Sequence, residues 1–248
     1  MKDTLKKDLE ALTCEGNVAS LPSAPLNDYA TLKKTLTKAN GKYKKNAFVF
    51  PNQAQDVIST LLGGTVVDFK KEFQFFATPP ELAEKMCNEI VGHMDMPVVG
   101  EFQAGHGALI DAVLKLRPSA TVTAIELAAL NYKELQRKYE DYTNVMVHQG
   151  DFMEMSKEIN PVFDIILANP PFTKNQDIDH IMKMYGLLAP GGQMVTVASQ
   201  SWTFGSQKKQ VAFREFVEEN ASMNVELGQG TFKSSGTGVS ARLLVFYK

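Results

Sequence analysis

Cysteine and long apolar runs are scarce in this sequence. Cys14 and Cys87 are its two cysteines, and one distant pair supplies neither a disulfide framework nor a set of metal ligands. No apolar run approaches the roughly 20 residues that a membrane-spanning helix needs, and residues 1–7 lack the apolar segment of a signal peptide. We therefore expect a cytoplasmic protein that holds no metal and contacts no membrane.

A surplus of positive charge is also missing. The formal net charge is −2, so no overall basic field indicates nucleic-acid binding. Residues 33–45 nevertheless contain six lysines and no acidic residue, namely Lys33, Lys34, Lys38, Lys42, Lys44 and Lys45. A run of this kind is usually a solvated surface, and the alternative interpretation is an arm that contacts phosphate groups.

The chain is long enough for one sizeable core with a small appendage, since it has 248 residues of which 44% are hydrophobic. In its first part, two short helical patterns at 27–38 and 53–62 are followed by a break at Gly63-Gly64. We expect residues 1–70 to form a small helical segment and residues 71–248 to form the main domain.

From residue 79 onward, helical and strand patterns alternate. Helices are expected over 79–93, 108–116, 127–140, 177–188 and 208–219, and strands over 97–102, 121–126, 144–148, 162–168, 193–198, 223–227 and 241–247. Thr78 is the expected N-cap of the first of these helices, which opens on two prolines. This alternation predicts an α/β fold, a Rossmann-like, mostly parallel sheet of seven strands with helices on both faces. The last two strands are expected to form an antiparallel hairpin at one side.

Three successive predicted strands end in an acidic residue. Glu101 precedes a glycine-rich turn, and a carboxylate there suits a ligand ammonium group. Glu126 suits the two hydroxyls of a ribose. Asp151 can accept from an adenine amino group, with Phe152 as an apolar wall, or it can simply cap a helix. Because the strands end at one edge of the sheet, the three acids together predict a ligand with ammonium, ribose and adenine groups.

The turn after the first of these strands contains Gly105 and Gly107. Glycine in this place lets a ligand approach the backbone closely, although tight strand-to-helix turns also use glycine for geometry alone. A second unusual turn, Asn169-Pro170-Pro171-Phe172, follows the buried strand that ends at Ala168. Proline removes backbone donors and biases the preceding residue away from helix. The result is a rigid corner that carries one amide and one aromatic ring.

These elements resemble the class I S-adenosylmethionine-dependent amino methyltransferases, and in particular the gamma-type adenine-N6 methyltransferases of DNA. Residues 75–79 resemble their F-x-T-P element, and residues 101–109 resemble their E-P-S-A-G-x-G-A-L loop, with Phe102 and Gln103 in place of proline and serine. The tetrapeptide 169–172 matches the N-P-P-F motif fully, and the three elements occur in the gamma order. The resemblance covers residues 73–248.

The resemblance implies S-adenosylmethionine as the cofactor and assigns residues to its site. The expected cofactor-binding residues are Phe76, Thr78, Glu101, Ala104, Gly105, Gly107, Glu126, Leu127, Asp151, Phe152 and Asn169. The expected catalytic residues are Asn169, Pro170, Pro171 and Phe172, and the expected substrate contacts are Phe172, Lys174 and Phe232. Lys208 and Lys209 are candidate backbone contacts. The target base would be flipped out or single-stranded.

The corner suits amino-group methylation because the amine on adenine is a poor nucleophile. The Asn169 side-chain oxygen and the Pro170 carbonyl would each accept from one hydrogen of the amine, which would free the lone pair of the nitrogen. Phe172 can stack on the base. Such rigid acceptors need little reorganisation, and in-line transfer is then a matter of positioning. Single histidines, His106, His148 and His180, are interpreted as structural, and Trp202 either lines the target cleft or packs in the core.

DNA is the preferred substrate, and three alternatives remain open. The first is an amino group on ribosomal or transfer RNA. The second is a protein glutamine, against which Phe172 and the upstream element argue. The third is a nucleic-acid-binding subunit of this fold without activity. Because no long recognition region is evident, a separate specificity subunit or a second copy is an expected partner, and a restriction–modification context is open.

Overall fold

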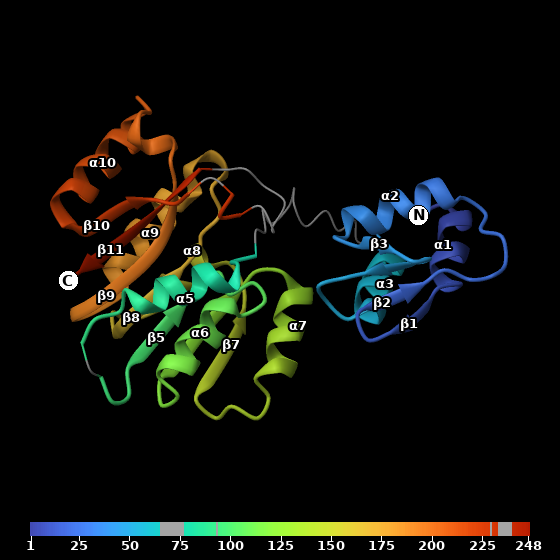
Figure 1. The fold of residues 1–248 in the computed structure, drawn as a ribbon, viewed down its shortest axis with the longest axis horizontal. Coiled ribbons are helices and arrows are strands. Elements are labelled where there is room, and N and C mark those ends of the chain that lie inside the picture. The colour runs from blue at the N-terminus through green and yellow to red at the C-terminus, as the bar shows by residue number, and fades with distance from the viewer. Residues whose placement is uncertain (65–76, 93, 229, 233–239) are drawn as a thin grey trace. The chain divides into compact units, whose positions relative to one another are not determined.

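The computed structural model describes residues 1–64, 77–92, 94–228, 230–232 and 240–248 (Figure 1). The chain divides into two compact units, Met1–Phe75 and Phe76–Lys248, and each is described by itself. Among the residues that are described, no helix combines the length and apolar character needed to cross a membrane.

The N-terminal unit combines helices with a small antiparallel sheet. Its helices are α1 (Asp3–Glu10), α2 (Tyr29–Lys38) and α3 (Ala54–Leu62). Its four strands, in the order β1-β2-β4-β3, are β1 (Thr13–Glu15), β2 (Val18–Ser20), β3 (Lys42–Lys44) and β4 (Ala47–Val49). The two predicted helices are present, and the unit also contains α1 and a small sheet, which the prediction of a small helical segment did not include. Strands of three residues are too short for an alternating apolar pattern to identify them.

The second unit contains a seven-stranded sheet in the order β10-β11-β9-β8-β5-β6-β7. Its strands are β5 (Val98–Glu101), β6 (Thr121–Glu126), β7 (Val145–Gln149), β8 (Phe163–Ala168), β9 (Leu188–Ser199), β10 (Ala221–Glu226) and β11 (Ala241–Tyr247). Strands β9, β8, β5, β6 and β7 run parallel, and β11 is antiparallel to both β9 and β10. The predicted seven-stranded fold with a terminal hairpin is confirmed.

Helices cover both faces of this sheet (Figure 1). Helices α5 (Pro80–Asn88), α6 (Ala108–Leu116) and α7 (Ala129–Lys138) pack on one face, and α8 (Phe152–Met155), α9 (Gln176–Leu187) and α10 (Lys208–Asn220) pack on the other. Successive side chains of a strand point to opposite faces. In β8, Ile165 and Leu167 therefore join the first core, whereas Ile166 and Ala168 join the second.

Three local predictions were wrong. Thr78 does not cap α5, because Pro79 occupies the N-cap position, and the helix ends at Asn88, before the expected end near His93, which lies outside the described residues. Strand β9 begins at Leu188 and includes Pro190, whereas the strand was expected to begin at residue 193. The pairing with β8 shifts between Phe163–Leu188 and Ile165–Gln193, so the extra residues form a bulge. Proline is tolerated within a strand at such a bulge.

Candidate active site

The acids at the strand ends lie along one edge of the sheet. Glu101 closes β5 opposite Ala124, and Glu126 closes β6 opposite Gln149 of β7. Asp151 follows β7 after Gly150. Beyond β5 the sheet continues through β8 to β9, so β5 and β8 flank the point where the chain order reverses. In open α/β sheets, ligands bind outside the carboxyl ends of the strands at such a point.

Glu126 is held from both sides by backbone donors. Gly105 N–H donates to its Oε2 over 2.7 Å, and Ala128 N–H donates to its Oε1 over 2.8 Å. The Asn131 amide lies 3.4 Å from Oε1. The side chain is 6% exposed, and burial raises the pKa of its carboxyl although these three donors act in the opposite direction. Because a carboxylate offers about four lone-pair sites, it retains acceptor capacity for ribose hydroxyls.

Glu101 is a buried carboxyl with few hydrogen-bond donors to stabilise its ionised form. It is 2% exposed and accepts from Gln103 N–H over 3.2 Å. Burial raises its pKa to about 8, with a smaller contribution of the same sign from Glu126 and an opposing one from the Gln103 N–H. No lysine or arginine of the described residues forms a salt bridge with it. A cationic ligand group beside it would stabilise its ionised form.

The glycine turn brings these two strand ends together. Ala104 N–H donates to Ile125 O over 3.0 Å, and Gly107 N–H donates to Ala104 O over 2.7 Å. Gly105 and Gly107 have φ angles of 57° and 80°, a region that glycine enters without steric cost. The turn thereby directs the Gly105 N–H at Glu126 and starts α6 at Ala108.

Replacing Gly107 with alanine is expected to destabilise the fold by about 1–3 kcal/mol. A Cβ there would overlap the Tyr139 hydroxyl and lie 3.0 Å from Leu135 Cδ2, at a positive φ that disfavours a side chain. Tyr139 cannot retreat freely, because its hydroxyl lies within hydrogen-bonding distance of two acceptors, Asp111 Oδ1 at 2.8 Å and Gly107 O at 3.0 Å. Urea unfolding monitored by circular dichroism measures the loss.

Gly186→Ala is the matched control for that substitution. Gly186 lies within α9, and a Cβ there meets nothing within 4 Å. Alanine in a helix interior is favoured over glycine by roughly 0.5–1 kcal/mol, so this variant is expected to be as stable as the wild type or slightly more so. Equal losses in the two variants would contradict a special demand for glycine at Gly107.

Asp151 and its neighbour Phe152 are placed differently from Glu101 and Glu126. Asp151 caps α8, because its Oδ1 accepts from Met153 N–H over 2.7 Å, as the alternative interpretation held. The Phe152 ring is buried and stacks on Phe102 at 4.8 Å between centroids. It therefore packs in the core behind the edge instead of presenting an open ring face. Leu127 is exposed, and Phe76 lies outside the described residues.

The proline corner follows β8 at the same edge. The Asn169 amide nitrogen donates to the Thr78 hydroxyl over 3.1 Å, so the segment before α5 is tied to the corner. Pro170 is buried, and Pro171 and Phe172 are partly buried. Phe172 meets Phe232 edge-on, with 6.3 Å between the ring centroids, and Phe232 itself is buried. The structure therefore brings Thr78, Asn169, Phe172 and Phe232 together.

A residue that the sequence did not single out links this corner to the next loop. Asn175 N–H donates to Phe172 O over 3.2 Å. Its side chain accepts from the Ser201 hydroxyl over 3.0 Å and donates to Gln207 Oε1 over 3.1 Å. Lys174 and Asn175 have φ angles of 54° and 57°, and two successive left-handed residues other than glycine are uncommon. Lys174 is exposed.

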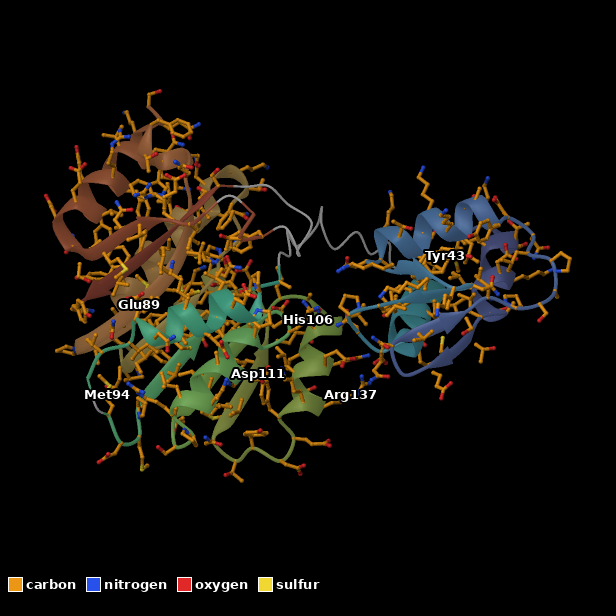
Figure 2. The ribbon with its side chains drawn as sticks, viewed as in Figure 1. Tyr43, Glu89, Met94, His106, Asp111 and Arg137 are labelled. Carbon is orange, nitrogen blue, oxygen red and sulfur yellow. The ribbon has the colours of Figure 1, made fainter. Side chains whose placement is uncertain are left out.

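The remaining candidates occupy structural positions. Trp202 is buried against Phe213, so it packs in the core. His106, in the turn before α6 (Figure 2), has its pKa lowered to about 4 by burial and, to a smaller extent, by Lys138. Burial is also the main cause of the lowered pKa of His180.

In the described part of the chain no cluster of three metal-ligating side chains occurs. Lys209 is engaged with Asp179 and with Asn175 O.

Comparisons with known proteins give a family and a fold. The family model described as methyltransferase small domain matches residues 87–225, more than half of the chain. The Type II methyltransferase M.AccI of Acinetobacter calcoaceticus is 26% identical over 114 residues, which are 46% of this chain and 21% of that protein. The chain thus spans about a fifth of the length of this relative.

Solved structures share the fold at low sequence identity. A dimethyladenosine transferase from Plasmodium falciparum has a TM-score of 0.51 at 18% identity and covers 70% of this chain and 64% of its own. The M. jannaschii TYW2 in complex with AdoMet has a TM-score of 0.51 at 16% identity, with 73% of this chain and 79% of its own covered. At these identities the likeness concerns the fold.

Proposed function

This chain belongs to the methyltransferase small domain family and is a class I S-adenosylmethionine-dependent methyltransferase; we propose that it methylates the exocyclic N6 amino group of adenine in DNA. The observation that carries the proposal is the Asn169 amide at the end of β8. Its nitrogen donates to Thr78, and its oxygen is proposed to accept from the substrate amine. Two prolines follow and hold the backbone of the corner rigid.

Each acid at the sheet edge is assigned to one group of the cofactor. S-adenosylmethionine, when bound, supplies a methyl group on a positively charged sulfur. Glu101, buried without a salt bridge to any described residue, is proposed to face the ammonium group. Glu126, oriented by the Gly105 and Ala128 N–H groups, is proposed to accept from the ribose hydroxyls. Asp151 is proposed to accept from the adenine amino group.

The proposed catalytic residues act on the target amine by position. The Asn169 oxygen and the Pro170 carbonyl accept from its two hydrogens, which draws its lone pair out of conjugation with the ring. Phe172, supported edge-on by Phe232, stacks on the base. The acceptors are fixed before reaction, so little reorganisation is needed. The proton leaves after the nitrogen has gained the methyl group, so the corner needs no strong general base.

The choice of DNA rests on the gamma order of the motifs, on the similarity to a Type II methyltransferase and on the N-terminal unit. In that unit Lys33, Lys34, Lys42, Lys44 and Lys45 are exposed on α2, β3 and the following turn. The Lys33 ammonium group lies 5.7 Å from the centre of the exposed Tyr43 ring (Figure 2). Exposed cations beside an aromatic ring suit a nucleic-acid backbone and its bases.

Incubation with methyl-labelled cofactor and DNA, RNA or protein tests this proposal. We expect label in DNA, and digestion of that DNA should release it as a modified adenine nucleoside. Label in RNA alone would replace the substrate with an RNA amino group, and label in protein would replace it with a glutamine. Cofactor binding with transfer to none of the three would indicate a nucleic-acid-binding subunit without activity.

The affinity for the cofactor is expected to rise with pH up to about pH 8. The pKa of Glu101 is raised to about 8, so below that value the free protein carries a proton on this carboxyl. An ammonium ligand requires the carboxylate, and binding must therefore release the proton. The change in Kd approaches about tenfold per pH unit below roughly pH 7. It weakens above that value and ends where the ligand amine itself loses its proton, at about pH 8.

Calorimetry in two buffers with different ionisation heats measures that proton release. Cys87 and Tyr139 also interact electrostatically with Glu101, but burial raises the pKa of Cys87 to about 12 and raises that of Tyr139, so both stay neutral in this range. Glu101→Gln should bind more weakly at pH 8 and should release about one proton fewer than the wild type, whereas any release from Glu126, whose pKa burial also raises, would remain. A wild-type protein with the same Kd at pH 6 and pH 7.5 would refute the ammonium assignment.

A further inference from the structure

The loop between β9 and α10 carries a strongly exposed aromatic ring. Phe204 is 77% exposed, more than any other large apolar side chain among the described residues. Single exposed apolar side chains are common on protein surfaces and need no special account. Phe204 differs because the backbone on both of its sides is fixed and because the loop is bonded to the proline corner.

The backbone around Phe204 is held by α10. The Arg214 guanidinium donates to the carbonyls of Trp202, Thr203 and Gly205, over 2.9, 2.7 and 3.3 Å. Gly205 N–H donates to Ser201 O over 3.0 Å, and Trp202 anchors the loop in the core. A Cβ at position 205 would overlap the Gln210 amide, so a larger residue there would displace that side chain. The ring is therefore exposed on a rigid support.

The same loop is bonded to the segment that carries the catalytic tetrapeptide. Asn175 donates from its backbone to Phe172 O and reaches Ser201 and Gln207 with its side chain. Asp177, fully buried at the start of α9, accepts from Ser199 N–H over 2.8 Å at the end of β9. These contacts fix the loop relative to the proline corner, at the edge of the sheet where β8 and β9 end.

Exposed lysines lie in the same region as the Phe204 ring. Lys174 and Lys208 are exposed, the first next to Asn175 and the second four residues beyond Phe204. Proteins that hold single-stranded or displaced bases combine an aromatic platform with cations that follow the phosphates. A base that enters the proline corner must leave its stack, and its former neighbours then expose a face.

We propose that Phe204 stacks on the DNA base next to the target base, with Lys174 and Lys208 on the adjoining phosphates. This inference rests on the proposed function and adds a substrate contact that the N-P-P-F resemblance does not supply. The ring does not touch the reacting atoms, so its contribution falls on DNA binding and not on cofactor binding.

Fluorescence anisotropy with a labelled mixed-sequence duplex and its single strand tests the proposal. Phe204→Ala is expected to raise the Kd for DNA about tenfold, a typical cost of losing one base-stacking ring, with the cofactor Kd unchanged. Phe204→Trp should restore binding. Met96→Ala is the matched control, because Met96 is 72% exposed but precedes β5 at the opposite edge of the sheet. It should bind DNA like the wild type.

Equal DNA affinity of wild type and Phe204→Ala, in a wild type that does bind DNA, would overturn this inference and leave the proposed function standing. A wild type that binds no DNA would overturn both. Sedimentation provides a further check: if Phe204→Ala dissociates a dimer and the resulting monomer binds DNA normally, the ring is a contact between copies of the chain and the proposal is wrong.

Discussion

Asn169→Ala is expected to lower the rate of methyl transfer by about 10²–10³-fold while the Kd for the cofactor stays within a fewfold. The loss of one fixed polar group aimed at the reacting atoms typically costs this much. The Asn169 oxygen is proposed to accept from the target amine, and no other side chain of the tetrapeptide can replace it. Single-turnover kinetics with saturating cofactor and DNA measure the rate, and calorimetry measures the affinity.

Asn144→Ala is a suitable control for that experiment. Asn144 also uses its amide structurally, since it donates to Ala120 O over 2.7 Å, but it precedes β7 and so lies at the opposite end of the strands. This variant should lose some stability and keep its rate. If Asn169→Ala instead loses its affinity for the cofactor in calorimetry, Asn169 is a structural residue and the catalytic assignment fails.

Glu126→Ala is expected to weaken cofactor binding by about 100-fold, because hydrogen bonds to a charged group contribute about 1.5–3 kcal/mol. The variant loses the proposed ribose acceptors and also leaves the N–H groups of Gly105 and Ala128 without the carboxylate. At saturating cofactor the transfer rate should recover to a large extent. Equilibrium dialysis and a cofactor titration of the initial rate separate the two effects.

Glu126→Gln sharpens this prediction. The amide keeps the shape of the side chain but turns one acceptor into a donor, which would face the N–H of Gly105 or of Ala128. An intermediate loss of affinity is expected. Unchanged cofactor affinity in Glu126→Ala would refute the ribose assignment, whereas unfolding of that variant but not of Glu126→Gln would assign the residue to the turn instead of to the ligand.

The main sheet could be predicted because its local patterns are strong and agree with one another. The β-branched run 121–126 and the helical spacing of 108–116 end where β6 and α6 end. Prediction failed where tertiary contacts override the local signal. Pro190 and the two glycines after it have the composition of a turn, yet they form a bulge within β9, because β8 and β11 pair with the residues that flank them.

The site was predictable only in part, for a similar reason. A carboxylate at a strand end is visible in the sequence, and the structure places Glu101 and Glu126 at one edge. The role of Thr78 was not visible, because its bond to Asn169 spans 91 positions and replaces the expected cap of α5. Asn175 gave no signal, since its partners lie 26 and 32 positions away and depend on the conformation of the 200–207 loop.

Mass spectrometry of nucleosides tests the central claim most directly. DNA is incubated with the protein and trideuteromethyl-labelled S-adenosylmethionine, digested, and compared with DNA treated with Asn169→Ala. We expect N6-trideuteromethyl-2′-deoxyadenosine from the wild-type reaction and a loss of that product in the variant. A trideuteromethyl group on cytosine, or equal amounts of the adenine product from both proteins, would contradict it.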